Sequence, residues 1–148
     1  MFGSAMLFGI VLGCLTITRM GDVWGRKPIY FFGLLIHIIV TCVIVFAKNV
    51  IVGYIMLGAM GYSLTMRYYI GYTYNVEMQP KSHAILASTI QFMFESVCYL
   101  FICLYFLTIS KDWRYLMIPN VTFSLFGMIS LSLMPESPRF LVSKKRFD

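Results

Sequence analysis

The chain has 148 residues, of which 59% are hydrophobic and only 12% charged, and its net charge at pH 7 is +6. Its mean hydropathy is +0.80. So few polar side chains cannot cover the surface of a soluble globule, which excludes a soluble globular protein. The composition therefore indicates an integral, multi-pass membrane protein.

Five apolar runs are long enough to cross a bilayer, which takes about 20 residues per helix. They cover roughly residues 1–18, 29–47, 51–76, 84–107 and 115–134. The predicted fold class is all-α, a polytopic membrane bundle of five transmembrane helices, with residues 1–148 as one transmembrane domain. In the first run Gly9 and Gly13 have the G-x-x-x-G spacing. This spacing indicates either close helix packing or the ordinary abundance of glycine in membrane helices.

A short polar segment, residues 21–28 with the sequence G-D-V-W-G-R-K-P, separates the first two runs. Two glycines suit tight backbone geometry, and Pro28 suits the first position of a helix. Two basic residues and one acid are typical of a short cytoplasmic connection between spans. We therefore predict a loop over these residues.

Two ionisable side chains lie inside the next two runs. His37 is near the middle of the second run, with Gly33 and Thr41 about one turn to either side. It could carry protons, although a lone intramembrane histidine is more often a neutral packing residue. Arg67 precedes Glu77 by ten residues, or about 15 Å of helix, near the middle of the membrane. There the arginine needs a partner or water.

The fourth run carries a polar stripe, since Ser88, Gln91, Glu95 and Cys98 recur at helical spacing. Such a stripe faces a water-filled cavity or packs against neighbouring helices. Glu95 lies at a depth similar to that of Arg67. We expect an ion pair between them beside the substrate cavity, the alternative being that Glu95 binds a cationic solute.

Basic residues gather at one end of the predicted spans, which indicates the cytoplasmic side. The amino terminus is then outside and the carboxyl terminus inside. This asymmetry explains the positive net charge, so no nucleic-acid partner is expected, and acidic lipid headgroups are the partner expected for residues 144–146. The basic residues on the cytoplasmic side are Arg19, Arg26, Lys27, Lys81, Arg139, Lys144, Lys145 and Arg146, against Lys48, Lys111 and Arg114 on the other.

The sequence has no pattern typical of an enzyme. Its cysteines, Cys14, Cys42, Cys98 and Cys103, lie within spans and lack metal-ligand spacing. A glycosylation sequon at residues 120–122 lies inside a span and is discounted. We expect no catalytic site, metal or cofactor.

Two motifs resemble those of a known family. The D-x-x-G-R-K core, at Asp22, Gly25, Arg26 and Lys27, resembles the loop between the second and third spans of the major facilitator superfamily. The P-E-S-P-R-F-L segment, residues 135–141, is similar to the segment after span six in its sugar and organic-ion members. The resemblance implies that the chain corresponds to spans two to six, so that span one and the carboxyl-terminal bundle are missing.

The resemblance also implies two groups of functional residues. Glu77 belongs to a cytoplasmic charge network that controls conformation, and we expect Arg139 or Lys81 to pair with it. Gln91 matches a glutamine that faces the central cavity in the family. The network comprises Asp22, Gly25, Arg26, Lys27, Glu77, Lys81, Glu136 and Arg139. The candidate substrate-binding residues are Gln91, from the resemblance, and Glu95, Arg67 and His37, which are singled out by their polar character inside the spans and not by the resemblance.

The expected function is secondary active or facilitative transport of a small organic solute by alternating access. Gly71 and Tyr72, at positions similar to those of the organic-ion branch, and the additional Glu95 favour organic ions over sugars. A sugar porter is the first alternative, and a non-transporting membrane scaffold or degenerate transporter fragment is the second. The expected partners are the solute, the lipid bilayer of the plasma membrane and the missing spans.

Overall fold

The computed structural model describes residues 2–80, 82–109 and 111–135, which form helices and short turns without a strand. Five stretches of these residues are long and apolar enough to cross a membrane. The predicted all-α bundle of five spans is therefore confirmed. The elements are α1 (Phe2–Trp24), α2 (Arg26–Phe46), α3 (Val50–Thr65), the π-helical turn η1 (Met66–Ile70), α4 (Gly71–Met78), α5 (Ala84–Thr108) and α6 (Arg114–Leu133).

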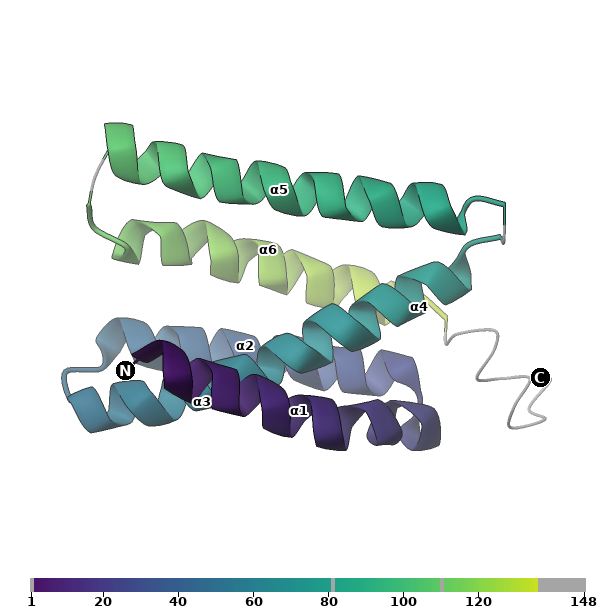
Figure 1. Cartoon of the computed structure of the whole chain (residues 1–148), viewed down its shortest axis with the longest axis horizontal. Coiled ribbons are helices and arrows are strands. Elements are labelled where there is room, and N and C mark those ends of the chain that lie inside the picture. The colour runs from purple at the N-terminus through teal and green to yellow at the C-terminus, as the bar shows by residue number, and fades with distance from the viewer. Residues whose placement is uncertain (1, 81, 110, 136–148) are drawn as a thin grey trace.

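The third span consists of three elements in sequence, α3, η1 and α4, and it contacts α1, α2 and α5 (Figure 1). Its α3 part packs closely against α1 and α2, whereas α4 crosses obliquely to meet α5. Helix α6 lies against α2. Helix α5 lies at the edge of the bundle, and none of its residues is buried.

Glycines allow α1 and α3 to approach one another closely. A side chain at Gly9 would collide with the carbonyl oxygen of Gly58, and one at Gly61 with that of Met6. At Gly13 an added Cβ would lie 2.6 Å from Oγ1 of Thr65. Because the obstacles at Gly9 and Gly61 are backbone atoms, only glycine fits there without separating the helices. Of the two interpretations of the G-x-x-x-G spacing, the structure supports close helix packing.

The connection between the first two spans is shorter than predicted. Helix α1 continues to Trp24 and α2 begins at Arg26, so the predicted loop over residues 21–28 is wrong. Gly25 has a φ of 102°, a conformation that glycine adopts without strain, and the chain changes direction at this residue. Pro28 is the third residue of α2 rather than the first. It fits because amides in the first turn of a helix have no intrahelical acceptor.

The π-helical turn η1 is fixed to the bundle by its apolar residues. Met66 and Ile70 are buried in a cluster with Ile17 of α1 and Ile29 of α2. A π-turn interrupts the regular helix and is frequent at functional sites. Met66 and Ile70 therefore fix η1 against α1 and α2.

Candidate functional site

Polar side chains of α5 face the third span, as the predicted stripe requires. Three hydrogen bonds link the two spans. The Tyr68 hydroxyl donates to Oε2 of Glu95 over 3.2 Å, the Tyr72 hydroxyl to Oγ of Ser88 over 3.4 Å, and Nδ2 of Asn75 to Oε1 of Gln91 over 3.0 Å. Cys98, the last member of the stripe, is exposed. The stripe thus supplies both packing contacts and polar groups for a site.

Glu95 contacts two tyrosines. Besides Tyr68, the Tyr99 hydroxyl donates to its Oε1 over 3.4 Å. The rings of Tyr68 and Tyr69 meet edge to face with centroids 5.8 Å apart. One carboxylate beside several aromatic rings is the combination that binds organic cations, through charge and cation–π attraction.

The predicted ion pair between Arg67 and Glu95 is wrong. Neither side chain forms a salt bridge with the other, and Glu95 is held by tyrosine hydroxyls instead. The Arg67 side chain lies against α2, where a Cβ on Gly33 would be 3.4 Å from its Cγ. Consecutive residues of a helix point in different directions, so Tyr68 reaches α5 while Arg67 faces α2. The prediction compared the depths of the two residues and left out their directions.

Arg67 and Gln91 line a common cavity of about 500 Å³ between α2, η1, α4, α5 and α6. Tyr30, Asn75 and Ser130 also line it. The fourth predicted substrate residue, His37, is buried in the core, where its Nε2 lies 2.8 Å from Oδ1 of Asn120 in α6. The candidate substrate residues therefore occupy three places: Glu95 among tyrosines, Gln91 and Arg67 in the cavity, and His37 between α2 and α6.

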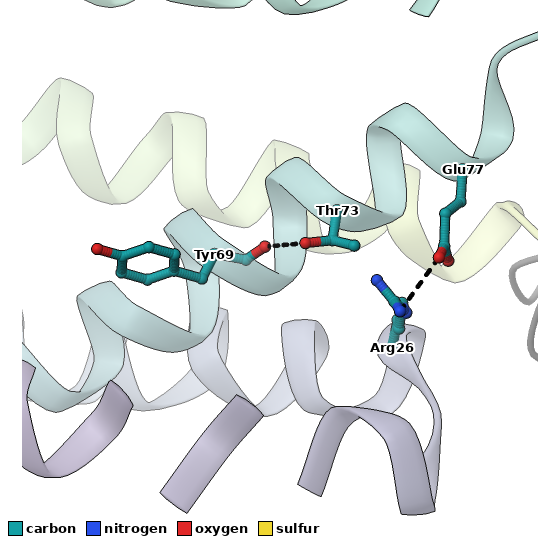
Figure 2. Close-up of polar contacts among 4 residues, drawn as sticks. All are labelled: Arg26, Tyr69, Thr73 and Glu77. Atoms are coloured by element: carbon teal, nitrogen blue, oxygen red, sulfur yellow. Dashed lines mark hydrogen bonds and ion pairs between the residues drawn. The ribbon is translucent and has the colours of Figure 1, made fainter. Parts of the chain in front are cut away.

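The end of the bundle where α2 starts and α4 ends, here called the charged end, is held by ionic contacts. Nη2 of Arg26 lies 3.1 Å from Oε1 of Glu77, and Figure 2 shows the two side chains meeting between α2 and α4. One turn before Glu77, Thr73 instead donates to the carbonyl of Tyr69 over 2.7 Å, within its own span. Lys27 donates to the carbonyls of Ser132 and Met134 at the end of α6.

The charged end thus brings together three members of the predicted network, Arg26, Lys27 and Glu77, with Gly25 as the turn. Lys81, Glu136, Arg139 and the Asp22 side chain lie outside the described residues, so the pairing predicted between Glu77 and Lys81 or Arg139 stays a prediction. Among the described side chains, no group of three histidines, cysteines or acids is placed to hold a metal ion.

Sequence reasoning missed several polar partners. Tyr99 follows Glu95 by four residues, the spacing that places two helical side chains side by side, so its role could have been found. Asn120 was considered only as part of a sequon, although an amide inside a span needs a polar partner. The contact between Tyr68 and Glu95 depends on how the third span crosses α5, and spacing within one helix gives no signal for it.

The chain matches the family described as "Sugar (and other) transporter" over residues 1–148. It is 29% identical to the organic cation transporter protein of Drosophila melanogaster over 147 residues, 98% of this chain and 26% of that protein. The organic cation/carnitine transporter 2 of Homo sapiens is 27% identical over 149 residues, 98% of this chain and 26% of that protein. The major myo-inositol transporter IolT of Bacillus subtilis is 31% identical over 150 residues, 97% of this chain and 32% of that protein. The chain thus spans about a quarter to a third of these relatives.

Proposed function

We propose that this chain, which belongs to the sugar (and other) transporter family of the major facilitator superfamily, forms part of a secondary active or facilitative transporter of a small organic solute. Its relatives are longer, so span one and a carboxyl-terminal bundle would complete the protein. Transport would follow alternating access, in which two helical bundles rock about a central site. The plasma membrane is the proposed location, with the charged end in the cytoplasm.

The solute we favour is an organic cation, and the surroundings of Glu95 are the observation that carries this choice. The carboxylate accepts hydrogen bonds from Tyr68 and Tyr99, and no basic side chain of the described residues pairs with it. A carboxylate inside a membrane span is costly without a counter-charge. A solute with a positive charge would supply that charge while its apolar groups contact the tyrosine rings.

A sugar is the second candidate, supported by the hydrogen-bonding groups of the cavity. Asn75 and Gln91 bond to one another across two helices at its wall. Amides of this kind suit the hydroxyl groups of a neutral polyol. The two candidates make different demands on Glu95, because a neutral sugar gains nothing from the negative charge.

Replacing Glu95 by glutamine distinguishes an organic cation from a sugar as the solute, because the substitution removes the negative charge and keeps the size of the side chain. The readout is uptake of labelled tetraethylammonium and myo-inositol by proteoliposomes that hold the protein completed with its remaining spans. We expect Glu95→Gln to lower tetraethylammonium uptake about ten-fold or more, equivalent to about 1.4 kcal/mol of lost binding.

The matched control is Ser96→Ala, the next residue of α5, whose exposed hydroxyl bonds only to the carbonyl of Phe92 within the described structure. It should transport like the unmutated protein. Inositol uptake that is unchanged in Glu95→Gln, together with no tetraethylammonium uptake by any variant, would establish the sugar porter instead. Uptake of neither solute at normal expression would support the scaffold.

A further inference from the structure

Arg67 is a buried cation that has no counter-ion among the described side chains. Its Nε is buried and has no hydrogen-bond partner, and the guanidinium forms no salt bridge with a described residue. It lies ten residues, or about 15 Å of helix, from Glu77 at the charged end, well inside the span. A charge at this depth is retained only where a counter-ion, a polar partner or water stabilises it.

The neighbours of Arg67 do not supply that counter-ion. Its neighbours on α2 are Tyr30 and His37, and neither carries a carboxylate. Glu77 is paired with Arg26, and Glu95 is held by tyrosines. Among the described side chains the positive charge is therefore uncompensated.

The cavity beside Arg67 is lined by hydrogen-bond donors. Tyr30 and Ser130 line it, and neither hydroxyl forms a hydrogen bond within the described structure. The Gln91 oxygen already accepts from Asn75, which leaves the Gln91 amide nitrogen to donate. None of the described residues that line the cavity carries a carboxylate, and its volume of about 500 Å³ admits a small ion together with water.

We propose that this cavity binds a small anion, with Arg67 as its charge partner and Tyr30, Ser130 and Gln91 as donors. Chloride and a compact carboxylate share the required chemistry, because a guanidinium binds either anion. It binds a carboxylate through two parallel hydrogen bonds, in a bidentate arrangement. The proposal is independent of the organic cation favoured above, since Glu95 lies outside the lining of this cavity, whereas a sugar would occupy the same cavity.

Chloride NMR tests the proposal without any transport assay. A chloride ion that exchanges with a protein site relaxes quickly while bound, so the protein broadens the chloride signal beyond the linewidth of empty nanodiscs. We expect this excess linewidth for the full chain in lipid nanodiscs, and its loss in Arg67→Gln. Displacement of chloride by acetate at similar concentration would assign the site to carboxylates, and absence of displacement would assign it to halides.

Arg114→Gln is the matched control, because it removes the same charge from the start of α6, where Arg114 lies 6.0 Å from the ring of Trp113. It should keep the excess linewidth. Circular dichroism and size-exclusion elution establish whether Arg67→Gln is folded; if it is not, Tyr30→Phe and Ser130→Ala should each reduce the excess. No excess in the unmutated chain, or equal excess in a folded Arg67→Gln, would overturn the proposal.

Discussion

Gly61→Val is expected to separate α1 from α3 and to reduce strongly the yield of folded protein. A Cβ at position 61 would collide with the backbone carbonyl of Met6, and backbone cannot move aside as a side chain can. Overpacking costs typically about 1–3 kcal/mol, and a clash between two backbones lies at the upper end or beyond. The measurement is the midpoint of thermal unfolding in detergent, together with the monodisperse fraction on size-exclusion chromatography.

The control for this prediction lies on the same helix. An added Cβ at Gly53 has no neighbour within 4 Å, so Gly53→Val makes the same chemical change in open space. Its unfolding midpoint should stay close to that of the unmutated protein. An equally lowered unfolding midpoint in both variants would mean that valine destabilises α3 at any position. The close approach to α1 would then not be the cause of the destabilisation.

The overall architecture followed from hydropathy because a bilayer imposes a single length on every span. Each predicted run coincides to within a few residues with one helix, or with α3, η1 and α4 together, and the largest difference is at residues 21–28, where a loop was predicted. There the charged residues Arg26 and Lys27 suggested a loop, but the first turn of a helix accommodates charge readily at the membrane interface. Element ends depend on backbone geometry at single residues such as Gly25, which composition does not reveal.

The candidate site was predictable in its residues but not in their pairing. Glu95, Gln91 and Arg67 were singled out because polar groups inside a span are costly and so have specific partners. Which partner each one meets depends on the rotation of one helix against another. The π-turn at residues 66–70 alters that rotation halfway along the span, and no periodicity in the sequence indicated it.

The ion pair at the charged end should show the strongest coupling between two side chains in this protein. The Glu77 side chain is 3% exposed and that of Arg26 is 20% exposed, so Arg26→Gln would leave a buried carboxylate without this partner. Removing one member of a buried ion pair typically lowers the free energy of unfolding by about 3–5 kcal/mol. The same loss is expected from Glu77→Gln. Arg26→Lys should recover only part of it, because lysine keeps the charge and lacks the planar fork.

The double variant, Arg26→Gln with Glu77→Gln, tests whether the two side chains stabilise the protein through their contact with each other. Replacing both charges removes the uncompensated group, so the double variant should be more stable than either single variant. Unfolding midpoints of the four proteins form a double-mutant cycle, whose coupling energy is expected to exceed about 1 kcal/mol. Lys48→Gln, at the opposite end of α2, controls for the loss of a positive charge. If the two single losses simply add in the double variant, the contact between Arg26 and Glu77 does not hold α2 to α4.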